Sequence, residues 1–251
     1  MIFNKIYLVI FMFLVVGCVD KTPITGRSQV VFISAEQERA LGDNSYREFL
    51  KNAKLSTDAA QSARVKKIGD KIAQAAQRPD FEWEFNLIED KQINAFCLPG
   101  GKVVVYTGIL AITKNDDQLA TVMSHEIAHA IARHGAERMS HQQISSGLQT
   151  LGNVLISVTA PEYKNIFNTA YGYGTHLGVM LPYSRSHEYE ADAIGIYLMK
   201  QAGYDINEAV KFWENMKQAK GKPQVEFFST HPNDDNRIKK ISELVEEIGK
   251  K

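Results

Sequence analysis

The segment from Thr121 to Gly135 contains the pattern His125-Glu126-x-x-His129, whose residue types and spacing could bind and use a metal ion. In an α-helix, residues four apart lie roughly 40° apart around the axis and about 6 Å apart along it. The two imidazoles can therefore approach one ion from one face. Glu126 lies about 100° further round, where its carboxylate could handle a water molecule at the metal without being a ligand.

A catalytic zinc ion takes three protein ligands and leaves one position open, so the pattern needs a third partner. Ser184–Lys200 predicts a second helix, on which Glu188 and Asp192 are four residues apart and share a face. We interpret Glu188 as the third ligand of one zinc ion per chain. Asp192 is then the acceptor for the remaining N–H of a ligand histidine, His125. The alternative is a solvated acidic face. Glu190 points to the opposite side, about 200° from Glu188.

The N-terminus has the features of an export signal. Lys5 is followed by an apolar run, Ile6–Val16, which is shorter than the roughly 20 residues of a membrane span and fits a secretory signal. The run ends in Val-Val-Gly-Cys18, which resembles a bacterial lipobox and would make Cys18 a lipidated membrane anchor. By resemblance to enterobacterial sorting rules, Val19 favours the outer membrane, facing the periplasm, over the inner membrane. An ordinary signal peptide or an uncleaved anchor is the alternative.

Composition sets the domain organisation. The 251 residues are 44% hydrophobic, which is enough for one large domain. Lys+Arg and Asp+Glu both number 29, and the resulting zero net charge gives no basic block for nucleic acid. We expect a signal peptide over residues 1–17, a lipidated tether over 18–34 and the functional domain over 35–251.

Periodicity and capping residues place the motif on a core helix. Asn115 should begin this helix and Gly135 should end it near His134, which would sit favourably at the helix terminus. Similar signals, including Ser34 with Gln37 as a capping box, predict the other helices. These cover residues 35–52, 57–77, 184–201 and 233–248.

Three runs of alternating or β-prone residues predict strands. Phe81–Ile88 alternates apolar and polar side chains, and Ile93–Leu98 and Lys102–Tyr106 flank a Pro-Gly-Gly turn. An edge strand beside the metal could hold an extended polypeptide by strand addition. A strand of the sheet core is the alternative. The residues that would bind such a substrate are Asn94, Ala95 and Phe96.

The segment from His141 to Pro182 separates the two expected ligand helices. Tyr171–Thr175 is too rich in glycine for a stable helix interior, so this region is either a lid over the site or a plain loop. The histidines outside the motif are expected at the surface or around the metal ligands. They are His141, His176 and His187.

Several ordered motifs together resemble a known family. HEIAHAIARH, SRSHEYEAD and STHPNDDNR, with INAFCLPGGKVVVYTGIL and PITGRSQ, are similar to segments of the HtpX-like and Oma-type zinc metallopeptidases of peptidase family M48. The resemblance is to the periplasmic, lipid-anchored branch and covers about Pro23 to Arg237. It implies an α+β fold, a mostly helical zincin-type domain with a small β-sheet beside the active-site helix.

The resemblance also implies roles for individual residues. It implies that His125, His129 and Glu188 bind zinc and that Glu126 is the general base. It adds two active-site residues from STHPNDDNR, which are His231 and Arg237. His231 could donate a hydrogen bond to an oxyanion, or it could occupy the open zinc position in a resting enzyme.

The implied activity is a zinc endopeptidase that degrades misfolded or unassembled cell-envelope proteins. Its partners would be polypeptide substrates, the membrane through Cys18, and envelope assembly machinery. The alternatives are a chaperone-like or assembly factor that uses the same cleft, and a latent enzyme.

Overall fold

The computed structural model describes residues 19–175, 181–219, 227, 231 and 236–250. The expected signal peptide, Cys18 and His176 lie outside the described residues. Among the described residues, no helix combines the length and the apolarity that a membrane span requires.

The motif helix α4 (Asp116–Ile131) lies at the centre of the body, and Asn115 caps it as predicted. Helices α2 (Ala35–Asn52) and α3 (Ala59–Ala76) precede it. The predicted capping box of Ser34 and Gln37 is present at the start of α2. These caps satisfy backbone N–H groups that the first helical turn leaves unpaired.

A three-stranded sheet in the order β3-β5-β4 lies beside α4. Its strands are β3 (Glu84–Ile88), β4 (Ala95–Leu98) and β5 (Lys102–Tyr106). The central strand β5 runs parallel to β3 and antiparallel to β4. The 3-10 helix η1 (Thr107–Ala111) follows β5. The predicted pair of strands is thus confirmed, with β4 as an edge strand.

The second ligand helix, α7 (Leu181–Gln201), packs directly on α4. A Cβ atom at Gly195 would lie 3.1 Å from the backbone nitrogen of His125, so the missing side chain permits this close approach. Helix α10 (Arg237–Gly249) packs on α7, and helix α8 (Glu208–Ala219) packs on α4 and α10.

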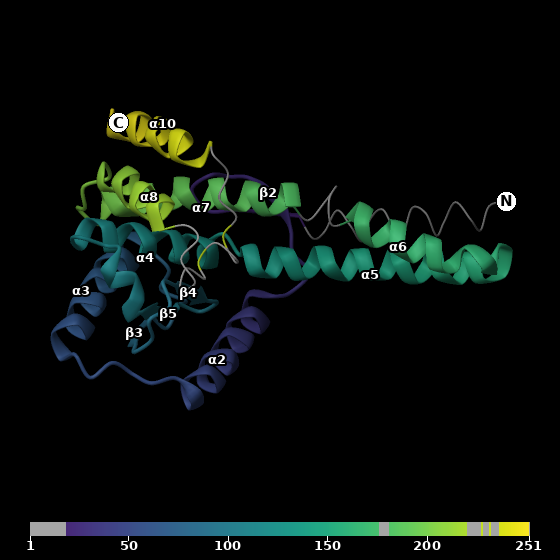
Figure 1. The fold of residues 1–251 in the computed structure, drawn as a ribbon, viewed down its shortest axis with the longest axis horizontal. Helices are drawn as coiled ribbons and strands as arrows, with labels where there is room; N and C mark the ends of the chain where they lie inside the picture. Colours follow the sequence, from purple (N-terminus) through teal and green to yellow (C-terminus); the bar gives the residue numbers. More distant parts are fainter. Residues whose placement is uncertain (1–18, 176–180, 220–226, 228–230, 232–235, 251) are drawn as a thin grey trace.

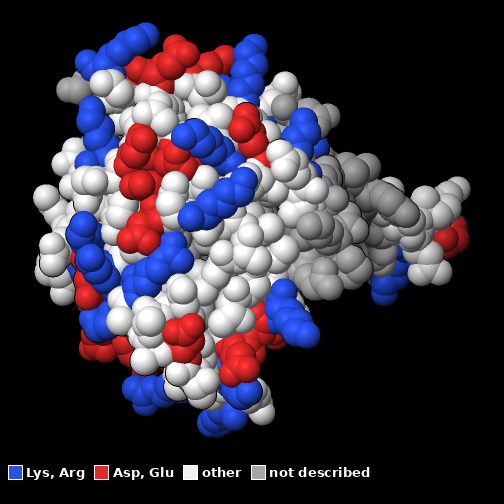
Figure 2. Space-filling view, turned by 60° about the vertical axis from the view of Figure 1, so that its left-hand side comes forward, with Lys and Arg blue, Asp and Glu red and all other residues white. Residues whose placement is uncertain are grey.

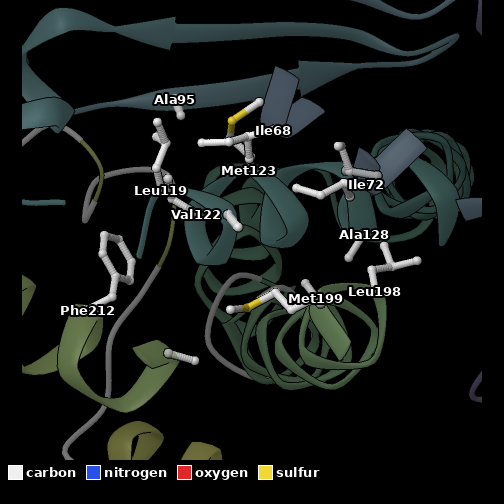
Figure 3. Close-up of a cluster of buried hydrophobic side chains, with 14 of the residues drawn as sticks. Ile68, Ile72, Ala95, Leu119, Val122, Met123, Ala128, Leu198, Met199 and Phe212 are labelled. Carbon is white, nitrogen blue, oxygen red and sulfur yellow. The ribbon is translucent and has the colours of Figure 1, made fainter. Parts of the chain in front are cut away.

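One apolar core joins these elements. Figure 3 shows side chains from α3, α4, α7 and α8 meeting on both sides of the motif helix. The core places α4 in an apolar environment on most of its surface, which explains why its polar motif residues are buried as well. Labelled members of this core are Ile68, Ile72, Leu119, Val122, Met123, Leu198, Met199 and Phe212.

The described part of the expected tether is structured. Strands β1 (Val19–Lys21) and β2 (Ser28–Val30) pair antiparallel. The backbone N–H of Phe32 donates to Ser140 Oγ at 2.9 Å, which ties the end of this strand pair to the helix that follows α4. The N-terminal segment therefore packs on the domain from Val19 onwards.

The motif helix ends earlier than predicted. Arg133 takes a left-handed conformation, with φ of 58°, and a new helix α5 (His134–Thr159) begins at once. The prediction of Gly135 as the helix end is therefore wrong, because Arg133 makes the turn. The side chain of Arg133 stabilises this conformation by donating to Glu38, to Asp20 and to the carbonyl oxygen of Ile33.

Helix α5 forms a hairpin with α6 (Lys164–Thr175) through the short 3-10 helix η2 (Pro161–Tyr163). Figure 1 shows this hairpin projecting far from the body. The expectation that the glycine-rich Tyr171–Thr175 avoids a helix is wrong, since these residues complete α6. The second ligand helix also begins earlier than the predicted start at Ser184, because α7 starts at Leu181.

Overall, the α+β prediction is confirmed: the described residues are mostly helical, with small sheets.

Candidate metal centre

The buried middle of α4 brings the two motif histidines together. The Nε2 atoms of His125 and His129 lie 3.1 Å apart, and both rings point to the same side of the helix. Glu188 reaches them from α7: its Oε2 lies 3.4 Å from His125 Nε2, and its Oε1 lies 3.4 Å from His129 Nε2. The three side chains predicted to bind metal thus converge from two helices.

These distances suit a zinc ion. Ligand atoms about 2.0–2.1 Å from a tetrahedral zinc ion lie about 3.3–3.4 Å from one another. The three separations between the His125, His129 and Glu188 atoms, 3.1, 3.4 and 3.4 Å, are close to this value. Burial opposes the charge on Glu188, yet hydrogen bonds from both histidines hold its pKa well below the ordinary value. The donor set is therefore two imidazoles and one carboxylate held ionised.

His231 adds a fourth possible ligand. Its Nδ1 lies 3.2 Å from Glu188 Oε1 and 3.4 Å from His125 Nε2. One ligand atom from each of the four residues lies within 4.8 Å of the others. On its other side, His231 Nε2 lies 3.3 Å from Glu126 Oε1. His231 therefore stands between the ligand group and the expected general base.

Glu126 is suited to accept a proton. It is buried beside the ligand group, and its Oε1 has no hydrogen-bond partner with acceptable geometry among the described residues. Burial raises the pKa of this carboxyl, while the nearby histidines His231 and His125 lower it. A raised pKa brings a carboxylate closer to the range in which general bases work at neutral pH.

Asp192 and Arg237 support the His125 side of the centre. Asp192 Oδ1 lies 2.9 Å from His125 Nδ1, which directs Nε2 of the ring towards the other ligands. Arg237, fully buried at the start of α10, donates to both carboxylate oxygens of Asp192 at 2.8 Å. Its Nη1 lies 2.9 Å from Glu188, and its guanidinium stacks 3.7 Å above the ring of Trp213.

This network also shifts pKa values on the His125 side. Burial opposes the charge on Asp192, but Arg237 and His125 hold the pKa of Asp192 below its ordinary value. Burial also lowers the pKa of His125, yet hydrogen bonds to Asp192 and Glu188 raise the pKa to about 9. Zinc binds the neutral imidazole, so zinc and a proton compete for this ring.

The His129 side is supported by residues that sequence reasoning missed. His134, the first residue of α5, places its Nδ1 2.9 Å from His129 Nδ1 and its Nε2 3.0 Å from Glu190 Oε2. Burial lowers the pKa of His134 to about 4, so its ring is neutral at pH 7. Glu190 does face away from Glu188, but the side it faces is a second buried network.

Arg27, between β1 and β2, closes this second network. Its guanidinium lies 2.6 Å from Glu190 and 2.7 Å from Glu137 of α5. Glu137 in turn lies 3.0 Å from Nε2 of His187, whose ring stacks on His134 with centroids 4.0 Å apart. Hydrogen bonds from His134, Thr25, Thr22 and Arg27 outweigh burial and hold the pKa of Glu190 at about 2. The signal in the sequence was PITGRSQ, which contains Arg27.

The β4 residues lie beside this centre. Ala95 is buried in the core, and Phe96 packs edge-on against Phe49 of α2. The backbone N–H of Tyr106 on β5 donates to the carbonyl oxygen of Asn94 at 3.2 Å. In an antiparallel pair, successive residues point their backbone groups alternately towards and away from the partner strand, so the N–H and C=O groups of Ala95 point away from β5. The N–H of Ala95 donates to Asn94 Oδ1 at 2.9 Å. This outward edge has no strand partner among the described residues.

Two contacts link the β4 edge to the metal centre. The N–H of Phe227 donates to the carbonyl oxygen of Ile93 at 3.3 Å, and the Phe227 ring stacks on His231 with centroids 4.3 Å apart. Burial and the nearby Glu126 charge both raise the pKa of Cys97 on β4, so this thiol stays protonated. The edge of the sheet and the ligand group therefore form one continuous region.

Comparison with known proteins agrees with the site. The model of "Peptidase family M48" matches residues 59–245 of the chain. The chain is 34% identical over 233 residues to the mitochondrial metalloendopeptidase OMA1 of Schizosaccharomyces pombe, which covers 91% of the chain and 67% of that relative. It is 32% identical over 225 residues to the β-barrel assembly-enhancing protease of Escherichia coli, which covers 87% of the chain and 46% of the relative. The chain thus spans between about half and two thirds of the length of these curated relatives.

Proposed function

The chain belongs to peptidase family M48 and is a zinc metalloendopeptidase, and from this premise we propose that it degrades misfolded or unassembled proteins of a bacterial cell envelope. The observation that carries the chemistry is the set of three ligand atoms 3.1–3.4 Å apart, with the buried Glu126 carboxylate beside them. The envelope setting is supported by the expected lipobox at Cys18 and by the similarity to the β-barrel assembly-enhancing protease.

The residues of the chain divide the reaction between them. We assign one zinc ion to His125, His129 and Glu188. When bound, zinc would polarise the scissile carbonyl and lower the pKa of the attacking water to about 7. Glu126 takes a proton from the attacking water and returns it to the leaving amine. Asp192 and Arg237 hold His125 and Glu188 in place, so the acceptor and the ligands keep fixed positions.

We assign substrate binding to the outward edge of β4. An extended polypeptide there would pair with the backbone of Ala95 and replace the contact that Asn94 Oδ1 now makes. The neighbouring Phe96 would contact side chains of the same segment. The hydrogen bond between Phe227 and Ile93 puts this edge next to His231, so a polypeptide on β4 would pass the metal centre.

Glu126→Gln tests the hydrolytic function. The substitution keeps the shape of the side chain and removes its basicity, so cleavage of an unfolded polypeptide should fall by at least about a hundredfold, the ordinary contribution of a general base. Zinc content, measured by elemental analysis, should remain at one ion per chain. The exposed Glu246 offers a matched control, since Glu246→Gln should cleave normally.

The same variant separates a protease from an assembly factor. If cells carrying Glu126→Gln retain full envelope function, the work is done by binding, and proteolysis is secondary. Purified protein that carries no stoichiometric zinc and cleaves no unfolded substrate would refute the hydrolase mechanism itself.

A specific observation also supports latency. His231 Nδ1 stands at ligand distance from its neighbours, while His231 Nε2 approaches Glu126, so this ring would block both the open metal position and the base. In a latent enzyme, His231→Ala raises basal cleavage. If His231 instead serves the oxyanion, the same variant loses activity, and kcat falls more than KM rises.

A further inference from the structure

The hairpin of α5 and α6 is chemically unlike the rest of the surface. Between Arg138 and Arg185, the sequence contains only two charged residues, Glu162 and Lys164. Figure 2 shows Lys, Arg, Asp and Glu side chains spread over the body, whereas few of them colour the part that projects at the right of the view. A projecting helical element in water ordinarily carries charge on its exposed faces.

Several polar contacts join the two helices. Asn153 and Asn168 exchange two hydrogen bonds of 3.0 Å, and Gln149 donates to Asn168 Oδ1 at 2.9 Å. The hydroxyl of Tyr171 donates to the carbonyl oxygen of Ser145 at 2.8 Å. Amide and hydroxyl groups thus fill much of the contact between the two helices, and the ring of Phe167, which lies against Gly152, adds one apolar contact.

Many of the apolar residues lie on the outside. One stripe runs along α5 with spacings of four, three, four and three residues, over about 21 Å. Its members are exposed, from 38% at Ile144 to 81% at Val158. The stripe consists of Ile144, Leu148, Leu151, Leu155 and Val158. Ile166, on α6, is 65% exposed as well. The hairpin therefore has its polar groups inside and much of its apolar surface outside.

From this inverted arrangement we propose that the α5–α6 hairpin lies in the surface of a lipid bilayer, with the α5 stripe inserted among acyl chains. A coiled-coil partner would require charged residues beside the stripe, and the flanking positions of α5 carry none: they are Ser145, Gly147, Gly152, Val154 and Thr159. Such an uncharged polar face with an apolar stripe is typical of helices that bind lipid through apolar insertion. Neither helix is apolar and long enough to span a membrane, so the hairpin lies along the surface.

The base of the hairpin orients the rest of the chain. Asp20 on β1 lies 3.2 Å from Arg133 at the start of α5, and Ser140 binds the backbone of Phe32. The stripe begins one helical turn further along, at Ile144. A membrane in contact with the stripe would therefore lie close to the described start of the chain. This contact needs no lipid on Cys18, so the inference is independent of the proposed anchor and of catalysis.

An environment-sensitive fluorophore on Val158→Cys tests the proposal. The full chain carries Ala in place of Cys18 and Cys97, and the vesicles are phosphatidylcholine with nitroxide groups on the acyl chains. We expect the emission to shift to the blue and to be quenched on vesicle addition, at low and at high salt. The matched control is Ser157→Cys, one residue earlier and about 100° round the helix, whose emission should change little.

A second pair of variants measures affinity with the fluorophore at position 158. Leu151→Gln together with Leu155→Gln should weaken vesicle binding by at least about tenfold, because two inserted side chains become polar. Ser146→Gln with Thr150→Gln, on the polar side, should leave binding unchanged.

Three outcomes would overturn the proposal. In the first, the emission at position 158 stays that of an aqueous environment with vesicles present. In the second, it is blue-shifted without vesicles and depends on protein concentration, which identifies a second copy of the chain as the occupant. In the third, binding requires anionic lipid, which identifies electrostatic attraction as its source.

Discussion

Two networks of buried polar side chains hold the two histidines of the motif, one by direct contact with a carboxylate and the other through an intervening histidine. On the His125 side, Asp192 contacts the ring itself, and the fully buried Arg237 binds both Asp192 and Glu188. On the His129 side, Glu190 acts only through His134, and its arginine comes from the N-terminal strand pair. Each network thus pairs one carboxylate of α7 with one arginine from a distant part of the chain.

The difference concerns what each network connects. The Asp192 network lies wholly within the body, between α4, α7 and α10. The Glu190 network extends from α7 to the N-terminal strand pair and ends at Arg27, whose side chain is 27% exposed. Water can solvate the Glu190 carboxylate in part if Arg27 is lost. We therefore expect the second network to contribute less to the free energy of unfolding than the first, and to act mainly by holding the His129 ring in position.

Arg237→Ala should give the largest effect in this comparison. It leaves the carboxylates of Asp192 and Glu188 buried without their cation, and breaking a buried pair in this way costs about 3–5 kcal/mol. Chemical denaturation should show this loss in the free energy of unfolding. A change below about 1 kcal/mol would mean that water enters the site and that the network is not closed.

Asp192→Asn should weaken zinc binding without unfolding the protein. The amide keeps the size of the side chain, but it holds the His125 ring less firmly. Losing the hydrogen-bond partner of a ligand histidine typically lowers metal affinity by about 10–100-fold. Competition with a chelator measures this affinity. The half-exposed Asp70, whose carboxylate pairs with Lys66 on the surface of α3, provides a matched control in Asp70→Asn. An unchanged affinity would show that Asp192 does not orient the ring.

Arg27→Ala should give the smallest effect of the three. The relay through Glu190 and His134 would loosen, and zinc affinity should fall by about tenfold or less. Arg39→Ala, which removes an exposed pair with Asp80, should leave zinc affinity unchanged. If Arg27→Ala weakens zinc binding as much as Asp192→Asn does, the two networks are equivalent and the comparison fails.

The sequence could predict the site residues that are related by the spacing within a single helix. The four-residue spacings place His125 with His129, and Glu188 with Asp192, and the structure brings His125, His129 and Glu188 together and sets Asp192 behind His125. His231 and Arg237 came from the family resemblance, because no periodicity connects them to the motif. Their roles in the reaction stay predictions until the variants are measured.

The sequence could not reveal which residues pack against the Glu190 side of the second ligand helix. Glu190 was correctly placed away from Glu188, but the position around one axis does not show which residues lie opposite. His134 was interpreted as a helix end because Gly135 is a common terminator. The left-handed turn falls at Arg133 instead, where contacts with Glu38 and Asp20 stabilise it. Those contacts join segments about a hundred residues apart, which local patterns do not report.

Arg133 also has a mechanical consequence. Ala132 and Arg133 join the ligand helix α4 to α5, a helix about 39 Å long. The short end of that arm is His134, whose ring touches His129. A tilt of α5 about the backbone of Arg133 would therefore displace His134 by a fraction of the movement at the far end. The junction therefore has the geometry of a pivot, with the outer hairpin at the far end of α5 and His134, which contacts the ligand ring of His129, at the near end.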